Sequence, residues 1–271
     1  MKIAAWNVHG NAKALDARPD LKGADILLLS EAPPSLQHHG LEMAGEEYTQ
    51  ALDCPQRPGP CSCKGRNWSA AIVSPHPLRP ISDARISKGG RTLAFGPSRQ
   101  GSWVAGRVKV RRDFEVTAIS LYGLMGGEKS DESVHRSLSE LSPIFDHEDY
   151  GRYLVLGGDL NTLAKPSRGE RAFARDKSVL DRIEALGLED LLKRDIRLKK
   201  QSAEGSCDCG SGDQCEHTWT YKHRKGDPAI VYQDDYLFAS SDLAALLPDC
   251  RSLGFTEASD HAPILASGDV G

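Results

Sequence analysis

The sequence predicts an α+β fold of four layers, α/β/β/α, in which two mainly antiparallel sheets pack face to face between outer helices. Two runs of short strand-like segments, each accompanied by a helical segment, favour two packed sheets. Residues 25–31 and 153–159 are almost continuously apolar, which is typical of strands that are covered on both faces. A chain of 271 residues with 39% hydrophobic content can bury a core as a single domain over residues 1–271.

Strands are expected where short apolar or alternating segments lie between turn residues. In chain order these segments are residues 2–7, 25–31, 68–74, 93–95, 103–110, 114–122, 153–159, 217–221, 231–240 and 259–266. Pro33 and Pro34 prevent the second strand from continuing. Apolar residues at helical spacing predict helices at 131–145 and 177–192, and residues 12–21 are weakly helical.

The overall charge excludes only one class of protein. A formal net charge of -4 is incompatible with a globally basic nucleic-acid coat protein, but an acidic metal cleft can have basic flanks.

Met1 is followed at once by a strand-like segment, and no apolar run of about 18 residues is present. We therefore expect a cytoplasmic protein without a membrane-spanning segment, and no obligate protein partner is evident.

Acidic residues stand at or near the ends of several predicted strands. Glu31, Asp159 and Asp260 occupy such positions, and Asp235 lies within the segment 231–240. Hard divalent cations such as Mg²⁺ prefer oxygen ligands and are held by a few carboxylates together with water and substrate phosphate. Strand ends that converge on one rim would bring these carboxylates together.

The spacing of neighbouring polar residues adds two expectations. Asp159 and Asn161 are two residues apart, so in an extended segment they would point the same way. Asp234 and Asp235 are adjacent and would face apart, so only one of them can serve a site.

Each of these residues alone also fits a plain structural role. Asp159 could cap a turn, Glu31 could be a solvated strand end, Asn7 a turn former, and Asp260 the partner of a structural histidine.

Five short motifs, taken together and in order, resemble those of the endonuclease/exonuclease/phosphatase superfamily. This group contains exonuclease III-like apurinic endonucleases, pancreatic DNase-like enzymes, tyrosyl-DNA phosphodiesterases, sphingomyelinases and inositol polyphosphate phosphatases. The matching segments are residues 2–10 (KIAAWNVHG), 29–31 (LSE), 158–161 (GDLN), 235–238 (DYLF) and 259–263 (SDHAP). The resemblance therefore spans nearly the whole chain.

The resemblance implies a metal site and a set of catalytic residues. Glu31 would bind the metal with Asn7 beside it, and Asp260 would support the metal or its waters. We expect Mg²⁺ or Mn²⁺ as the cofactor.

On the catalytic side, the resemblance implies that Asp159 positions or deprotonates the attacking water and that Asn161 holds a phosphate oxygen. Asp235 would orient His261, which would face the scissile phosphate. Tyr122 matches a phosphate-contacting tyrosine of the apurinic-endonuclease branch.

The chain departs from the family pattern at two positions. His9 stands where the apurinic-endonuclease branch often has an acid, so schemes with a second metal or an extra water are not carried over. Ser30 replaces the common glutamine before the metal-binding glutamate. Residues 29–34 (LSEAPP) also resemble the tyrosyl-DNA phosphodiesterase branch, so the branch stays open.

Two cysteine-rich loop insertions, near residues 53–67 and 199–217, are expected. All but one of the seven cysteines are in them, and each loop has a Cys-x-Cys pair with thiols on one side of an extended backbone. A structural Zn²⁺ site would fit, although two incomplete sites or free thiols are alternatives and disulfides are disfavoured in the cytosol. The candidate ligands are Cys54, Cys61, Cys63, Cys207, Cys209, Cys215 and His217.

The leading functional hypothesis is Mg²⁺-dependent hydrolysis of phosphodiester bonds by a nuclease or DNA-repair-type phosphodiesterase, through metal-assisted in-line attack of water. Arg66, Asn67 and Trp68 provide a cation, an amide and an aromatic ring for binding a nucleic-acid substrate, although they also fit a solvated loop. One alternative is a phosphatase or phosphodiesterase acting on a lipid, inositol or nucleotide. A second is a non-catalytic, zinc-stabilised binding module.

Overall fold

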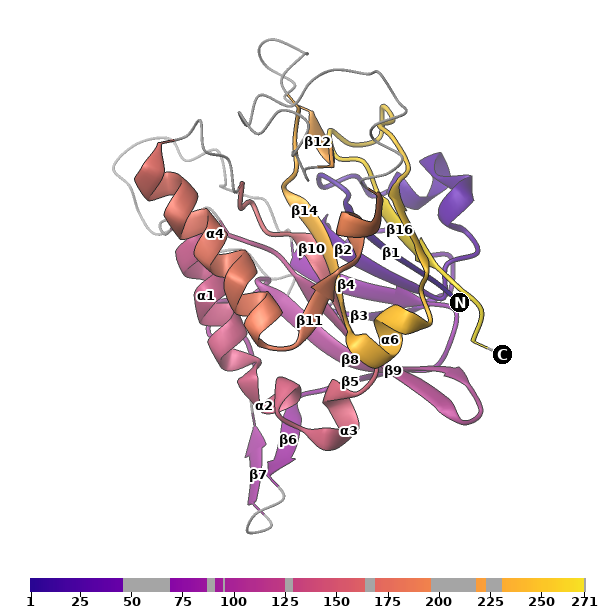
Figure 1. Ribbon diagram of the computed structural model, residues 1–271. Coiled ribbons are helices and arrows are strands. Elements are labelled where there is room, and N and C mark those ends of the chain that lie inside the picture. Colours follow the sequence, from indigo (N-terminus) through magenta and orange to yellow (C-terminus); the bar gives the residue numbers. More distant parts are fainter. Residues whose placement is uncertain are drawn as a thin grey trace.

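Two six-stranded sheets form the centre of the fold (Figure 1). The computed structural model describes residues 1–45, 69–86, 91–94, 96–124, 129–163, 169–195, 218–222 and 231–270. The first sheet has the strand order β15 (Asp249–Ser252), β16 (Ile264–Ser267), β1 (Lys2–Asn7), β2 (Ile26–Ala32), β4 (Ser69–Ser74) and β3 (Glu42–Ala44). The second has the order β11 (Leu188–Asp190), β14 (Asp235–Ser240), β10 (Leu154–Asp159), β9 (Phe114–Leu121), β8 (Trp103–Arg111) and β5 (Leu78–Pro80).

Both sheets are mainly antiparallel, as predicted from the sequence. Among the described strands, β1 and β2 form the parallel pair of the first sheet, and β9 and β10 form that of the second. Two short hairpins lie outside the sheets: β6 (Asp83–Ile86) with β7 (Arg91–Ala94), and β12 (Tyr221–Lys222) with β13 (Val231–Tyr232).

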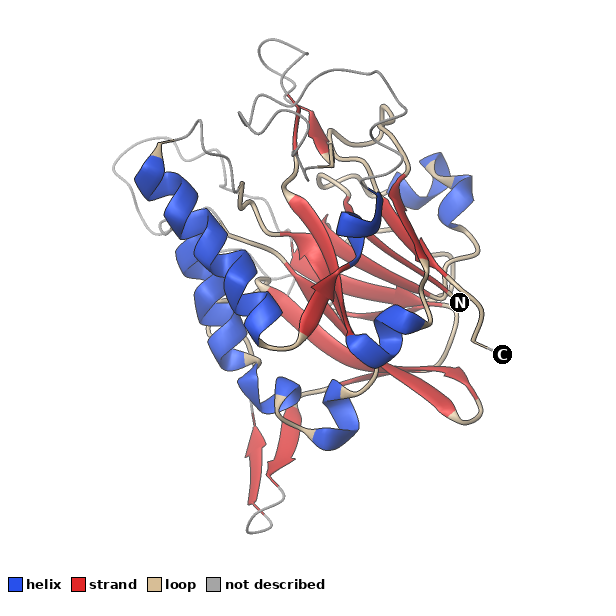
Figure 2. Cartoon of the chain, viewed as in Figure 1, coloured by secondary structure: helices blue, strands red, loops and turns tan. Residues whose placement is uncertain are grey.

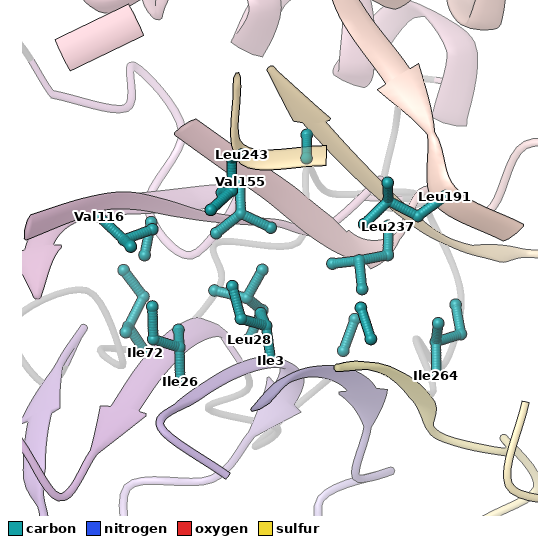
Figure 3. Packing of buried hydrophobic residues seen from close by; sticks show 14 of the residues in the cluster. Ile3, Ile26, Leu28, Ile72, Val116, Val155, Leu191, Leu237, Leu243 and Ile264 are labelled. Atoms are coloured by element: carbon teal, nitrogen blue, oxygen red, sulfur yellow. The ribbon is translucent and has the colours of Figure 1, made fainter. Parts of the chain in front are cut away.

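The main core lies between the two sheets. Alternate residues of β1 point in opposite directions, so that Ile3 packs between the sheets while Trp6 packs on the outer face. Figure 3 shows Leu28 of the first sheet close to Val155 of the second, with Leu237 also in this layer. Full burial of each such side chain contributes about 1.5–3 kcal/mol.

The outer layers differ in their helices. The helices α1 (Ser130–Glu140) and α4 (Glu170–Ala185) cover the second sheet, where Leu138 and Ile183 pack with Leu156 (Figure 2). Two short 3-10 helices, η1 (Ala14–Ala17) and η2 (Pro19–Leu21), cover the outer face of the first sheet. The other helices in the described part of the chain are α2 (Ser142–Phe145), α3 (Glu148–Gly151), α6 (Ser241–Ala245) and the 3-10 helix η5 (Leu191–Asp195).

Two helix predictions need correction. The helix expected at 131–145 is divided into α1 and α2, because Pro143 has no N–H with which to continue the hydrogen-bond pattern. The helix expected at 177–192 begins seven residues earlier, at Glu170, and ends at Ala185. Gly187, at φ 83°, turns the chain there, and Leu188 is buried as part of strand β11 instead.

The strands nearest the C-terminal end were also predicted too long. The segment 231–240 is interrupted at residues 233–234 between β13 and β14, and β12 begins only at Tyr221. The strand expected at 259–266 begins at Ile264. Residues 259–263 form a bend instead, in which the Ser259 hydroxyl accepts a hydrogen bond from the His261 N–H at 3.0 Å.

None of the described helices has both the length and the apolar character needed to cross a bilayer.

Gly158 allows the two sheets to approach closely. Its φ is 139°, and a Cβ at this position would lie 2.2 Å from the Leu121 carbonyl oxygen and 2.9 Å from the Ser30 hydroxyl. Gly254 provides a matched comparison, because its φ is 77° and nothing lies within 4 Å of its Cβ position.

We expect Gly158→Ala to lower the free energy of unfolding by about 3 kcal/mol, since backbone strain and overpacking both act there. Gly254→Ala should cost about 1 kcal/mol, from backbone strain alone. Urea denaturation of both variants measures the difference. Equal losses would contradict a close contact at Gly158.

Candidate active site

Polar residues from both sheets meet at one end of the core. Asn7 is the last residue of β1, and Glu31 lies near the end of β2. In the second sheet, Asp159 ends β10 and is directly opposite Asp235, the first residue of β14. The sheet register therefore brings the acidic strand ends together, as the sequence led us to expect.

Hydrogen bonds join the sheets at this rim. The Asn7 side-chain amide donates to Asp159 Oδ2 at 2.7 Å, and the Asp159 N–H donates to the Ser30 hydroxyl at 2.9 Å. The Ser120 hydroxyl also donates to the Leu29 carbonyl oxygen at 2.8 Å. Asn7, Ser30 and Asp159 are at most 1% exposed, so this contact is part of the interior.

Glu31 is held in an unusual backbone conformation. Its φ is 52°, at the point where the pairing of β2 with β4 changes register. The Tyr122 hydroxyl donates to Glu31 Oε1 at 3.0 Å, whereas Oε2 is buried and accepts no hydrogen bond from the described residues. Burial raises the pKa of Glu31, although Asn7, His261, His9 and Tyr122 oppose this effect. A bound cation would relieve this unfavourable burial.

His9 lies between two carboxylates. Its Nδ1 is 3.5 Å from Glu31 Oε2 and 3.2 Å from Asp260 Oδ1. The His9 N–H donates to Asn7 Oδ1 at 2.8 Å, so that the same asparagine contacts both Asp159 and the His9 loop. This contact of His9 was not foreseen beyond its departure from the family pattern.

His261 is fixed on several sides. Its Nδ1 is 2.7 Å from Asp235 Oδ2, and its Nε2 is 3.9 Å from Asp159 Oδ2. The Trp6 indole donates to its carbonyl oxygen at 3.0 Å, and the Tyr221 ring packs against its imidazole with centroids 4.7 Å apart.

The acids around His261 determine its charge. Burial lowers the pKa of His261, but the charge and hydrogen bond of Asp235, with the charges of Asp159 and Asp234, raise the pKa well above the ordinary histidine value. We conclude that the imidazole is held in its protonated form in the metal-free protein.

Asp159 and Asn161 do lie together, although the segment that joins them is not extended. Asn161 has a φ of 48°, and its N–H donates to Asp159 Oδ1 at 2.8 Å. Its side-chain amide is 3.2 Å from Asp159 Oδ2 and also donates to the Gly123 carbonyl oxygen at 3.1 Å. Burial raises the pKa of Asp159 well above its usual range; His261 opposes this shift, and nearby acids reinforce it.

Two sets of described residues could hold a cation. Asp159, Asp235 and His261 offer ligand atoms within 4.8 Å of one another, but Asp159 Oδ2, Asp235 Oδ2 and His261 Nδ1 already form hydrogen bonds with each other or with Asn7. The second set centres on Glu31, whose Oε2 is buried without a hydrogen bond, as is Asp235 Oδ1 in the first set. Glu31 therefore offers a free oxygen ligand for a hard divalent cation.

The structure brings together eight of the residues that were selected from the sequence: Asn7, Glu31, Tyr122, Asp159, Asn161, Asp235, Asp260 and His261. The candidate zinc ligands Cys54, Cys61, Cys63, Cys207, Cys209, Cys215 and His217 lie outside the described residues, so a zinc site remains a prediction. Arg66, Asn67 and Trp68 also lie outside them. Cys250, which belongs to neither loop, is buried in β15.

Sequence reasoning missed the part played by Tyr221 and by the two serines Ser30 and Ser259. Tyr221 follows a segment with no motif, and its backbone bridge and ring contact with His261 place it at the site. Ser30 and Ser259 appeared only within motifs, whereas the structure shows that both are buried and bond to backbone atoms across the rim. The one sequence feature that could have indicated these buried contacts is that each serine is a small residue next to a charged one.

Comparisons with known proteins identify the fold. No model of a known protein family matches the chain, and no curated protein matches it. An AP endonuclease from Leishmania major superposes with a TM-score of 0.64 at 16% identity, covering 98% of this chain and 86% of that one. The 3'-5' exonuclease NExo from Neisseria meningitidis gives a TM-score of 0.58 at 19% identity, covering 99% and 100%.

The endonuclease domain of TRAS1, a telomere-specific non-LTR retrotransposon, gives a TM-score of 0.58 at 16% identity, covering 99% of this chain and 98% of that one. At such identities the likeness establishes the fold alone. This chain therefore has the fold that these endonuclease and exonuclease structures share.

Proposed function

We propose that this protein is a divalent-metal-dependent phosphodiesterase that hydrolyses nucleic acid, with DNA as its substrate. The observation that carries the proposal is the buried arrangement in which Asp159 accepts a hydrogen bond from Asn7 while His261 is paired with Asp235. Buried acids that are not needed for a reaction or a cation would destabilise the fold. This cost also argues against a non-catalytic binding module.

Asp159 is suited to position and deprotonate the attacking water. Asn7 and Asn161 fix its carboxylate with side-chain amide donors, so that it has one orientation toward an incoming group. Its pKa is raised by burial, which brings its basicity closer to that needed for proton abstraction near neutral pH.

His261 is suited to stabilise negative charge on the phosphoryl group. Asp235 occupies Nδ1, which leaves Nε2 as the ring atom directed toward Asp159. An imidazolium in this water-poor position would donate to a non-bridging oxygen as charge develops there. Asn161, half-buried beside Asp159, would hold a second phosphate oxygen.

Glu31, with Asp260 nearby, would hold the cation, which we propose to be Mg²⁺ or Mn²⁺. When bound, the cation would neutralise charge on the phosphate and leaving oxygens. Tyr122 would keep Glu31 Oε1 in place through its hydrogen bond, which leaves Oε2 as the ligand atom.

DNA is favoured over lipid or inositol substrates by the names of similar structures. These include AP endonucleases and a Neisseria protein described as a 3' phosphatase bound to a product DNA hairpin. An inositol, lipid or nucleotide phosphoester remains the alternative substrate class, since these share the same hydrolytic chemistry.

A panel of labelled substrates tests the proposed function. With Mg²⁺ or Mn²⁺, we expect cleavage within a panel of plain duplex DNA, abasic DNA and DNA with a 3' phosphate, and much less turnover of RNA or inositol phosphates. His261→Ala and Asp159→Asn should each lower kcat by at least about a hundredfold, the usual contribution of a positioned acid-base group.

His135 and Asp181 provide matched controls, because both lie on outer helices and their side chains hydrogen-bond to other side chains of those helices. His135→Ala and Asp181→Asn should keep wild-type rates, with circular dichroism showing that all four variants are folded. Wild-type kcat in His261→Ala or Asp159→Asn would refute the assigned roles. Turnover of inositol phosphates alone would refute DNA as the substrate.

Activity should disappear in EDTA and return on addition of excess Mg²⁺ or Mn²⁺, because Glu31 offers oxygen ligation and the described rim contains no thiol. Rates measured before chelation, after chelation and after metal addition check this expectation. Undiminished turnover in excess chelator would show that no dissociable cation takes part.

The charge on His261 should depend on Asp235 more than on its neighbour Asp234. In metal-free protein, Asp235→Asn should lower the pKa of His261 by about one unit or more, because it removes the adjacent charge. Asp234→Asn should have a smaller effect, because its charge raises the pKa of His261 less than that of Asp235, which also hydrogen-bonds to the ring. NMR titration of the imidazole measures both, and the reverse ranking would show that the wrong aspartate is assigned.

A further inference from the structure

We propose that His9 is a nitrogen ligand of the catalytic cation and that it makes the site selective for Mn²⁺ and similar transition ions over Mg²⁺. The inference rests on the metal dependence proposed above. His9 Nδ1 would complete a set of one imidazole and two carboxylates with Glu31 and Asp260.

The distances around His9 fit donors that share one coordination sphere. With metal–ligand bonds of about 2.1 Å, donors at right angles lie about 3.0 Å apart, and tetrahedral donors lie about 3.4 Å apart. His9 Nδ1 is 3.2 Å from Asp260 Oδ1 and 3.5 Å from Glu31 Oε2. A cation could therefore bind Nδ1 and either carboxylate after only a small adjustment.

An ion pair alone explains this arrangement less well. His9 can donate its Nδ1–H to only one of the two carboxylates, and Asp260 Oδ1, at 3.2 Å, is the nearer one. Glu31 Oε2, 3.5 Å from Nδ1, is then left buried without a hydrogen bond. Glu31 is only 8% exposed, so water does not solvate this oxygen, and a cation would.

The backbone fixes His9 in this position at an energetic cost. His9 has a φ of 51°, a region that costs a non-glycine residue about 1–2 kcal/mol. Its loop is bonded to the end of β2 on both sides, through Val8 N–H to the Ser30 carbonyl and Gly10 N–H to the Glu31 carbonyl, both at 3.0 Å. The imidazole is thus presented to the carboxylates by a rigid turn.

A nitrogen ligand changes which cation the site prefers. Mg²⁺ is a hard cation that favours oxygen ligands, whereas divalent transition ions accept an imidazole nitrogen more readily, from Mn²⁺ with the smallest gain to the later ions with larger ones. Having histidine rather than an acid at this position also removes one negative charge. The loss of this charge weakens the binding of any divalent cation. The nitrogen donor offsets that loss for transition ions but not for Mg²⁺.

Pulsed EPR of Mn²⁺ bound to chelator-treated full-length protein tests the proposal without using activity. We expect modulation from a coordinated nitrogen in the wild-type spectrum and its loss in His9→Asp, which restores an all-oxygen set. Calorimetry should show the preference for Mn²⁺ over Mg²⁺ falling by at least about tenfold in that variant.

His39 gives a matched control because it also has a positive φ, 53°, and pairs with Asp16 away from the rim. His39→Asp should keep both the nitrogen modulation and the metal preference. Mn²⁺ that binds with no nitrogen modulation, or modulation that persists in folded His9→Asp, would overturn the proposal and leave the proposed function intact. Failure of wild-type protein to bind either ion would overturn the proposed metal dependence as well.

Discussion

The contact between Asn7, Ser30 and Asp159 is the constraint on which the rest of the site depends. Apolar side chains can hold two sheets together at many relative offsets, because the hydrophobic effect has no preferred direction. Buried hydrogen bonds do have directional requirements, and leaving one unmade costs about 1–3 kcal/mol. The bonds from the Asn7 amide and the Asp159 N–H therefore select one offset, the one that places β1 and β2 beside β10.

The charges at the rim follow from that offset. Glu31, Asp159, Asp235 and Asp260 are brought within reach of the same small volume, and each is largely buried. His261 compensates part of their charge through Asp235. The burial that raises the pKa values of Glu31 and Asp159 leaves the group short of positive charge, which a divalent cation would supply.

Much of the fold and of the site could be predicted from the sequence. Strands such as β1, β2 and β10 have apolar sequences that leave few alternatives, and their last residues were identified from motif order. The limits of α4 could not be predicted, because Leu188 is apolar in either a helix or a strand and only pairing with β14 decides between them. Similarly, the bend before β16 depends on the Ser259 hydroxyl meeting Asn7, a partner 252 residues away in sequence.

The role of His9 was beyond prediction for a different reason. Its residue type could be noticed as unusual, but its position between Glu31 and Asp260 depends on a left-handed turn, on the end of β2 and on the bend before β16. Local secondary-structure propensity does not predict contacts among three segments that are far apart in the sequence. The same holds for Tyr221, whose ring reaches His261 from a short hairpin outside both sheets.

The pairing of β1 with β16 has a consequence for how the protein matures. Ile3 pairs with Ala266, and the Trp6 indole supports His261 from 255 positions away along the chain. Contacts between such distant residues form late in folding, because the loop between them must first be closed. On a growing chain β1 thus keeps an open edge until β16 has been synthesised, and the site is completed only when β16 adds to that edge.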